Sequence, residues 1–151
     1  MHVPIKVDYG VRALVDLALY GQNGPVRASD IARRTMIPVP FLAQVLHNLG
    51  KKNLVKSQRG PHGGHILASD PHKVSLNSVM EALVGVETSI KCLDDISCCT
   101  QVSSCSQREI WREVDTAVLQ ILRRTTVGQL VERTRTMQTQ QLNLVSNKNP
   151  G

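Results

Sequence analysis

Four cysteines lie within a fourteen-residue segment of this sequence, and the rest of the chain contains none. Clustered thiolates bind zinc or iron–sulfur clusters, or form a thiol-based redox switch. Zinc ribbons pair their ligands in Cys-x2-Cys hooks, and this sequence has no such hook. The spacing of Cys92, Cys98 or Cys99, and Cys105 instead favours an open loop that wraps around a larger group, such as an iron–sulfur cluster.

Cys98 and Cys99 are adjacent in the sequence, so we expect their side chains to diverge. One of the two is then expected to bind a cluster, and the other is expected to be spare. A switch that uses these thiols without a metal is the alternative interpretation. The sequence has no Ser-His-Asp arrangement, phosphate-binding loop or HExxH motif, so we do not expect an enzyme.

A second candidate site is basic and rich in glycine. Residues 1–73 contain ten Lys or Arg and four Asp or Glu, whereas residues 74–151 contain eight of each, so the net charge of +6 falls entirely in the first half. Such a surplus is typical of a surface that binds a polyanion. The stretch RGPHGG, residues 59–64, lies in this half. Its glycines would let a loop approach a phosphate backbone, and Arg59 could enter a narrow minor groove.

The residues around this stretch predict the elements that position it. Apolar residues at spacings of three and four predict an amphipathic helix over residues 6–21. Ser29 is expected to cap a short helix that ends near Met36, and a second helix over residues 38–52 tolerates Pro40 in its first turn. Short strands are predicted at residues 54–57 and 65–68, joined by a hairpin loop. A helix-turn-helix followed by such a hairpin is a winged helix.

The second half predicts a long helix and a less regular segment. Ser75 is expected to cap a short helix over residues 76–85, and residues 86–104 show no sustained periodicity. A long helix is predicted from 106 to 125, and a last helix, capped by Thr126, over residues 127–138. The long helix carries an apolar stripe that suits a twin helix from a second subunit: Trp111, Val114, Val118 and Ile121.

Together these patterns predict a mainly α-helical protein with a small two-stranded β wing. We expect a winged helix-turn-helix DNA-binding domain at 1–84, a cysteine loop at 85–105, a dimerisation helix and final helix at 106–137, and a disordered polar tail at 138–151. No apolar run approaches the length of a membrane span, and the first residues lack the apolar core of a signal peptide. We therefore expect a cytoplasmic protein with no membrane partner.

The order of these elements, the wing motif RGPHGG, and a Cys…Cys…Cys loop followed by Trp111 in a long helix resemble the winged-helix transcription regulators of the Rrf-two type, over about residues 4–137. That family includes the iron–sulfur regulators IscR, NsrR and RirA and the cluster-free regulator CymR. The resemblance implies that residues 38–52 form the recognition helix. The residues that we assign to DNA binding are Ser29, Pro40, Phe41, Gln44, Arg59, Gly60, His62 and Gly63.

The resemblance also implies an iron–sulfur cluster, with 4Fe-4S favoured and 2Fe-2S as the other form. In cluster-binding members the middle and last cysteines are five residues apart, with a tryptophan six residues beyond the last. Cys99, Cys105 and Trp111 reproduce this spacing. The implied ligands are therefore Cys92, Cys99 and Cys105, with Cys98 as the alternate.

Three positions bear on what can be carried over from the family. The histidine that completes the cluster site in some members falls at Arg108 of this chain, and arginine does not ligate iron. Other members use an aspartate donated by the partner subunit, and Asp8 occupies the matching place. A glutamate that tunes the choice of DNA sites in one member is replaced by Ala43, so the operator preference does not transfer.

The sequence therefore predicts a homodimeric transcription regulator whose affinity for double-stranded DNA is set by an iron–sulfur cluster that senses iron, redox state or nitric oxide. The nearest alternative is a metal-free thiol switch on the same fold. An alternative from another class is an iron–sulfur carrier or scaffold protein that binds no DNA. The wing and the basic first half argue against that last interpretation.

Overall fold

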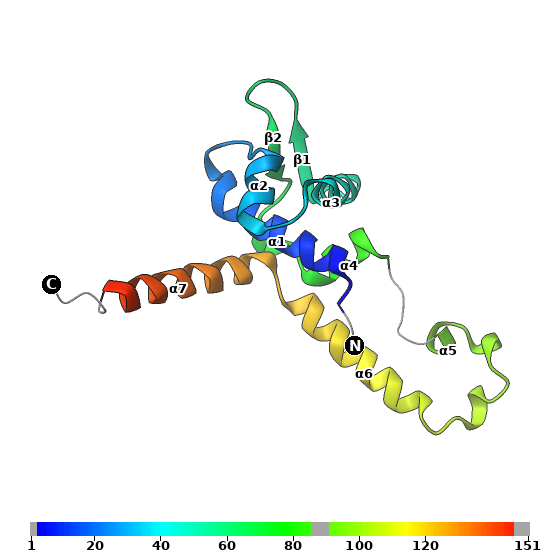
Figure 1. Ribbon diagram of the computed structural model, residues 1–151. Coiled ribbons are helices and arrows are strands. Elements are labelled where there is room, and N and C mark those ends of the chain that lie inside the picture. The colour runs from blue at the N-terminus through cyan, green and yellow to red at the C-terminus, as the bar shows by residue number, and fades with distance from the viewer. Residues whose placement is uncertain (1–2, 86–90, 147–151) are drawn as a thin grey trace.

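The computed structural model describes residues 3–85 and 91–146, and within these ranges the chain is mainly helical, with one short β hairpin that projects at one end (Figure 1). The helices of the first half are α1 (Ile5–Tyr20), α2 (Ala28–Thr35), α3 (Val39–Lys51) and α4 (Leu76–Leu83). The antiparallel strands are β1 (Val55–Gln58) and β2 (Gly64–Leu67). The second half contains α5 (Lys91–Asp94), α6 (Arg108–Arg124) and α7 (Val127–Ser146). The predicted fold class, mainly α with a two-stranded wing, is confirmed.

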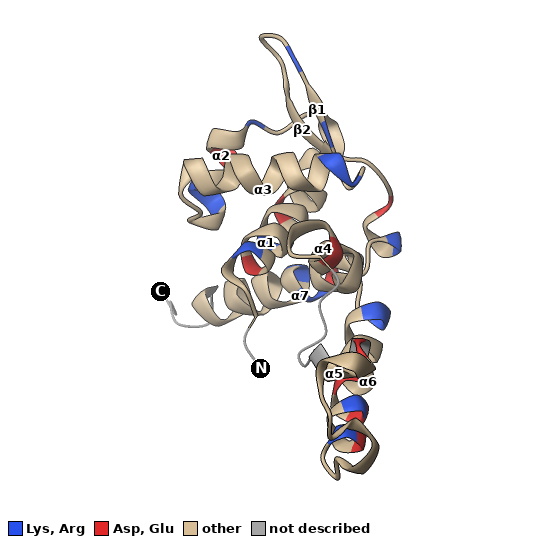
Figure 2. Ribbon diagram, turned by 90° about the vertical axis from the view of Figure 1, so that its right-hand side faces the viewer, with Lys and Arg blue, Asp and Glu red and all other residues tan. Residues whose placement is uncertain are grey.

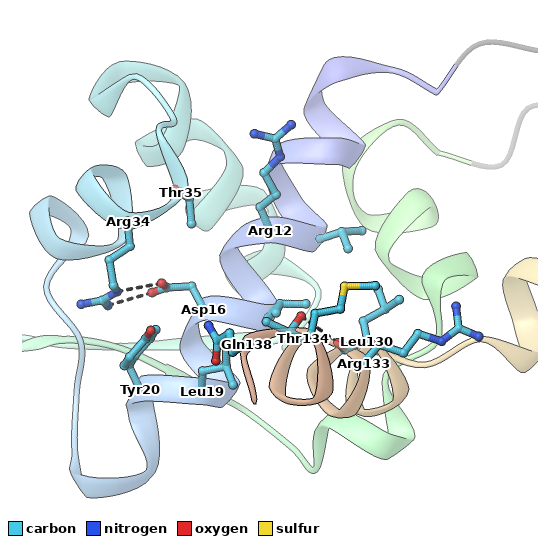
Figure 3. A pocket seen from close by; sticks show the side chains of 13 residues that line it. Arg12, Asp16, Leu19, Tyr20, Arg34, Thr35, Leu130, Arg133, Thr134 and Gln138 are labelled. Atoms are coloured by element: carbon cyan, nitrogen blue, oxygen red, sulfur yellow. Dashed lines mark hydrogen bonds and ion pairs between the residues drawn. The ribbon is translucent and has the colours of Figure 1, made fainter. Parts of the chain in front are cut away.

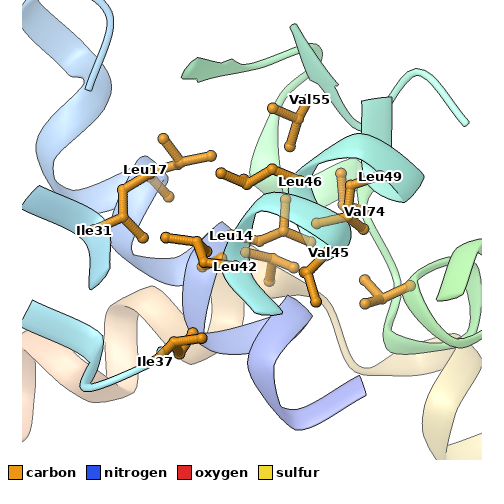
Figure 4. Packing of buried hydrophobic residues seen from close by; sticks show 14 of the residues in the cluster. Leu14, Leu17, Ile31, Ile37, Leu42, Val45, Leu46, Leu49, Val55 and Val74 are labelled. Carbon is orange, nitrogen blue, oxygen red and sulfur yellow. The ribbon is translucent and has the colours of Figure 1, made fainter. Parts of the chain in front are cut away.

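One apolar core joins α1, α2 and α3 (Figure 4). Leu14 and Leu17 of α1, Ile31 of α2, and Leu42 and Leu49 of α3 are all at most 1% exposed. Full burial of one such side chain stabilises the fold by about 1.5 to 3 kcal/mol. The core therefore fixes α2 and α3 rigidly against α1 and against each other.

The break between α2 and α3 lies where the sequence predicts it. Met36 follows the last residue of α2 and adopts a left-handed backbone conformation, with φ of 59°. Ile37 is 2% exposed and anchors the turn in the core. Pro38 is the N-cap of α3, and Pro40 lies in the first turn, where a missing N–H costs little.

The predicted cap at Ser29 is wrong. Helix α2 begins one residue earlier than Ser29, at Ala28, and its N-cap is Arg27, which makes no side-chain capping bond. The reason lies outside the local sequence. Val26 pairs with His65 of β2 through two backbone hydrogen bonds, and this bridge holds the chain extended until just before the helix begins.

Two other predicted caps are confirmed. The Ser75 hydroxyl accepts a hydrogen bond from the backbone N–H of Ser78 at the start of α4. At the start of α7, the Thr126 hydroxyl accepts from the N–H of Gln129, and the Gln129 side chain accepts from the N–H of Thr126. This reciprocal arrangement is a capping box, which satisfies two otherwise unpaired donors.

The predicted disordered tail is wrong for residues 138–146, because α7 continues to Ser146. Residues 139–146 carry no charge, and they contain glutamine and leucine, which favour helices, with no Pro or Gly before Pro150. Residues 147–151 of the predicted tail lie outside the described residues.

Helix α6 leads away from the end of the molecule that carries the wing (Figure 1). It contacts α4 and α5, yet none of its seventeen residues is buried. Within the part of the chain that the structure describes, no helix combines the length and apolar character needed to cross a membrane.

Candidate nucleic-acid interface and cysteine loop

The helices α2 and α3 and the wing lie together at one end of the molecule (Figures 1 and 2). The residues that the sequence assigns to DNA binding come from these three elements. Seven of them are exposed, and the eighth, Gly63, is partly buried in the wing loop. The structure therefore gathers the predicted DNA-binding residues on one accessible part of the surface.

Helix α3 has an apolar side and a polar side. Its buried residues Val45 and Leu46 face the core, whereas Pro40 and Gln44 are exposed. Phe41 is 54% exposed, and its ring packs edge-on against Tyr9 of α1, with ring centroids 6.3 Å apart. Phe41 thus braces α3 against α1 while leaving about half of its surface open.

The wing is a tight hairpin that only glycine allows at two positions. A Cβ at Gly63 would collide with the backbone of Gln58, and one at Gly64 would collide with the carbonyl of Val26. The strands are shifted by one residue from their predicted ends, so that the loop covers residues 59–63. Arg59 is exposed in this loop and has no hydrogen-bond or ion-pair partner among the described residues.

His65 of β2 is half-buried at the base of the wing. Its Nδ1 atom shares a hydrogen bond of 3.0 Å with the hydroxyl of Ser57 on β1. Burial lowers the pKa of His65 from its ordinary value of 6.5, because a charged imidazolium loses water contacts there. His65 is therefore mainly neutral at neutral pH and contributes no fixed charge to this surface.

The charge distribution separates the two ends of the molecule (Figure 2). Lys51 at the end of α3, Lys56 of β1 and Arg59 of the loop are all exposed, and neither β strand carries an acidic residue. Helix α6 instead mixes both signs along its length. The positive surface therefore coincides with the predicted DNA-binding elements.

An ion pair that sequence reasoning missed holds α2 to α1 (Figure 3). Arg34 donates to both carboxylate oxygens of Asp16 at 2.8 Å, and Asp16 is 5% exposed. The guanidinium also lies over the ring of Tyr20, 4.2 Å from its centroid. The bond to Asp16 is the main cause of the raised pKa of Arg34. The pair lines a cavity of about 580 Å³ between α1, α2 and α7.

The four cysteines lie in or beside short turns of the segment between α4 and α6. Cys92 is in α5, Cys98 ends a short 3-10 turn that starts at Ile96, and Cys99 follows it directly. Cys105 follows a second such turn. All four are free thiols, with Cys98 and Cys99 exposed and the other two partly buried.

The described residues of a single chain do not form a closed metal site. No group of three or more His, Cys, Asp or Glu side chains within residues 3–85 and 91–146 could hold a metal ion. Asp8 lies on α1, where its carboxylate pairs with Arg12 of the next turn, at 2.8 Å. The structure thus brings the predicted cysteine ligands into one segment and leaves Asp8 apart from them.

Arg108, at the position where some family members have a histidine ligand, contacts the loop in another way. Its Nε donates to the backbone carbonyl of Cys92 at 3.2 Å. The bond connects the first turn of α6 to the first cysteine, sixteen residues earlier in the sequence. Nothing in the local sequence pattern indicates this contact, because it joins two elements across the loop.

The surroundings of Cys98 disfavour ionisation of its thiol. Its pKa is raised from 9.0, first by desolvation and then by the nearby Cys92, Asp95 and Cys99. Because the thiolate is the form that attacks disulfides and binds metals, a raised pKa makes a cysteine less reactive.

The predicted dimerisation stripe of α6 is largely exposed in the single chain. Trp111, Val114 and Ile121 are 43%, 46% and 50% exposed, and Val118 is partly buried. The indole N–H of Trp111 donates to the side chain of Gln107. Four large apolar side chains on one helix therefore lack full cover within their own subunit.

A helix-turn-helix, a glycine-rich wing and a positive surface over both define a winged-helix DNA-binding transcription regulator. The family model for Rrf2, described as "Iron-dependent Transcriptional regulator", matches residues 4–133. The chain therefore belongs to the Rrf2 family, as the sequence resemblance implied. Members of this family are DNA-binding transcription regulators and not enzymes.

Two relatives illustrate the sequence similarity. The chain is 32% identical over 131 residues to "Protein rrf2" of Nitratidesulfovibrio vulgaris, and the aligned region covers 87% of each protein. It is also 32% identical over 132 residues to "HTH-type transcriptional regulator IscR" of Vibrio campbellii, covering 87% of this chain and 78% of that protein.

Two solved structures illustrate the similarity of fold. CymR (YrzC), "the Global Cysteine Regulator of B. subtilis", has a TM-score of 0.75 and 26% identity, with 88% of this chain and 98% of that chain covered. T. potens IscR has a TM-score of 0.70 and 28% identity, with 89% and 88% covered. The fold is thus similar to both named kinds of regulator.

Proposed function

We propose that this protein is a homodimeric regulator that binds double-stranded DNA through α3 and the wing, with an affinity set by an iron–sulfur cluster in the segment 91–105. The observation that carries the proposal is the set of four free thiols gathered in short turns outside the winged-helix core. A group held there can change shape or charge without unfolding the DNA-binding end.

The donor chemistry fits such a cluster, since thiolates are the ligands that iron–sulfur clusters use. Cys92, Cys99 and Cys105 are the proposed ligands, with Cys98 as the alternate, and 4Fe-4S is favoured over 2Fe-2S. A bound cluster would supply reversible redox chemistry and a response to iron, redox state or nitric oxide. The described donors of one chain do not converge on a metal site, so Cys92, Cys99 and Cys105 would hold a cluster only after a rearrangement of the segment 91–105.

The fourth position is assigned to Asp8 of the partner subunit. In the single chain its carboxylate is held by Arg12, with side-chain exposures of 37% for Asp8 and 50% for Arg12. Exposed ion pairs of this kind contribute about 0 to 1 kcal/mol. The carboxylate can therefore leave Arg12 at small cost and act as a labile ligand in a site between subunits.

The route from the cysteine segment to the DNA-binding end passes through α6. Arg108 connects Cys92 to the first turn of α6, and α6 contacts α4, which packs on α1. A cluster changes DNA affinity only if it stabilises one arrangement of the two winged helices more than another. A shift of α6 against its twin helix would provide the two arrangements.

A metal-free thiol switch is the second candidate, and the open arrangement of the cysteines favours it. The similarity in fold to CymR points the same way, because the family resemblance gives that cysteine regulator as cluster-free. The raised pKa of Cys98 argues against Cys98 as the attacking thiol.

We place the regulator in the cytoplasm under either mechanism, because that is where bacterial chromosomal DNA lies. Membership of a regulator family leaves no support for the carrier or scaffold interpretation.

The test is an anaerobic purification followed by an absorption spectrum, iron and sulfide analysis, and gel shifts with genomic fragments. We expect a coloured protein with iron and sulfide, and a DNA affinity that changes when the cluster is removed. A colourless protein whose DNA binding follows thiol oxidation would establish the second candidate instead. Iron and sulfide in a protein that binds no genomic fragment would contradict both.

A further inference from the structure

Arg27 contacts the wing although it lies outside the wing, the recognition helix and the residues assigned to DNA. It is the N-cap of α2, and its Nη2 atom donates to the carbonyl of Pro61 in the wing loop at 3.2 Å. The two residues are 34 positions apart in the sequence. This bond spans from the start of the helix-turn-helix to the loop that carries Arg59.

The base of the wing is held to the same point by backbone bonds. The N–H of Val26 donates to the carbonyl of His65 at 2.9 Å, and the N–H of His65 donates to the carbonyl of Val26 at 2.8 Å. Gly64 permits this close approach, because a Cβ there would meet the Val26 carbonyl. These backbone bonds reach only His65. The position of residues 59–63, which extend beyond it, therefore depends on other contacts.

The start of α2 is itself a fixed reference. Ile31 is fully buried against the core that also contains Leu42 of α3, and Arg34 is paired with the buried Asp16 of α1. A group tied to the first residues of α2 is therefore tied, through rigid packing, to the recognition helix. Val26 and Arg27 connect the wing to this rigidly packed start of α2.

We propose that Arg27 is a positioning residue for DNA binding, which holds the wing loop 59–63 beside α2 and so sets the place of Arg59 relative to α3. The inference rests on the proposed use of the wing to bind DNA. Its physical basis is preorganisation: a loop that is already held in place loses less conformational entropy when it binds. Arg27 itself then acts through Arg59 and needs no contact with DNA.

A double-mutant cycle separates this role from a direct contact between Arg27 and a phosphate. Arg27→Met removes the donor and keeps the length of the side chain. We expect it to weaken specific DNA binding about threefold to tenfold, the range of one net hydrogen bond. In an Arg59→Ala background the same substitution should cost less than about twofold, because the loop no longer carries its groove contact.

Arg33→Met is the matched control, because Arg33 is an exposed arginine of α2, the helix that Arg27 caps, and it pairs only with Asp30 among the described residues. It should change affinity far less than Arg27→Met does. Equal losses from Arg27→Met in both backgrounds would show a direct phosphate contact and overturn the proposal. Unchanged affinity in the Arg27→Met protein would overturn it as well.

A measurement without DNA tests the same tie independently. Nitrogen-15 relaxation of the loop amides should show faster and larger motion in Arg27→Met, with an unchanged melting temperature, and Arg27→Lys should restore part of the rigidity. Unchanged loop motion would overturn the proposal even if DNA binding fell. If the wild-type protein bound no DNA, the proposed function would fail, and loop motion alone would then decide whether the tie exists.

Discussion

Three arginines show how much the surroundings decide what one residue does. Arg34 is paired with the buried Asp16 and stacked on Tyr20, so its charge serves the fold. Arg27 reaches across to Pro61 of the wing. Arg59 has no partner among the described residues and keeps its charge available for DNA. Composition alone counts these three residues alike, whereas the structure gives each of them different surroundings.

Arg59→Ala tests the groove contact directly. We expect specific DNA binding to weaken by about 1 to 3 kcal/mol, the value typical of a side chain that reads a groove. The measurement is a binding titration at several salt concentrations, with Lys56→Ala as the control for loss of charge on the same hairpin. An Arg59→Ala protein that binds like the wild type at every salt concentration would remove the wing from the interface.

Single substitutions also decide which cysteines hold a cluster. Cys92→Ala, Cys99→Ala and Cys105→Ala should each abolish the cluster, because each removes a strong bond and a negative charge that offsets the iron. Cys98→Ala should retain it, and serves as the matched control beside Cys99. The measurement is absorption and iron content after anaerobic purification. Loss of the cluster in Cys98→Ala with retention in Cys99→Ala would exchange their roles.

Asp8→Ala should give an intermediate result. The cluster should assemble without oxygen, show a changed spectrum and decay faster in air, because water or an external thiol takes the open position. Mixing Asp8→Ala with Cys92→Ala subunits should restore one complete site in some heterodimers, since the two defects then lie in different sites. An Asp8→Ala protein with the wild-type spectrum and lifetime in air would exclude this carboxylate as a ligand.

The side-chain contacts between residues far apart in the sequence are the part of the site that the sequence does not predict. Local patterns predict the turn after α2, the prolines of α3 and the glycines of the wing, and the family resemblance implies which residues of α3 face DNA. The ties Arg34–Asp16, Arg108–Cys92 and Arg27–Pro61 join residues 18, 16 and 34 positions apart. Periodicity and capping signals describe neighbours in sequence, so contacts at such separations appear only when the chain is folded.

At the scale of elements, the wing and α7 show what local patterns can and cannot predict. Alternating residues and glycines predict both strands of the wing to within one residue, because the turn chemistry fixes the hairpin locally. The start of α2 was mispredicted because the bridge from Val26 to His65 comes from another element. Helix α7 is longer than the sequence pattern predicts, because the polar residues after Gln138 favour a helix even though their composition resembles that of disordered segments.

The stability of the wing should depend on pH through His65. Its pKa in the folded protein is lowered by burial, so the unfolded chain binds a proton at pH values where the folded chain does not. Stability from this group is complete above about pH 6.5 and decreases as the pH falls through 6.5 toward the lower folded value. Urea titrations between pH 8 and pH 5 should show the decrease.

His65→Gln is the control for this dependence, because glutamine keeps a polar group at the position and does not titrate. The loss of stability on acidification should be smaller in His65→Gln than in the wild type. If both proteins lose stability equally between pH 8 and pH 5, another group causes the dependence and the assignment to His65 is wrong.

At the scale of the whole molecule, the two ends have opposite characters. The winged-helix end has a buried core and a positive surface, whereas α6 has mixed charge and an apolar stripe without full cover. Burial of that stripe between two copies would place two winged helices in one symmetric unit, as pseudo-palindromic DNA sites require. The proposed functions of DNA binding and assembly therefore use separate surfaces of one chain.

Replacing Val114 and Val118 together with Asp should produce monomers, because each new charge would be buried against its symmetry mate. Sedimentation velocity measures the change. Gln120→Asp places the same charge away from the stripe on the same helix and should leave the assembly intact. If the double Asp variant sediments like the wild type, α6 is not the dimer interface.

The lack of any buried residue in α6 also bears on how long the protein survives in a cell. A seventeen-residue helix without burial is marginal in water, so in a dilute, unassembled chain α6 should fray and expose its backbone to proteases. Newly made chains at low copy number would then be degraded faster than chains that have met a second copy. In the proposed dimer the second copy would cover α6, so the lifetime of the regulator would rise with its own concentration.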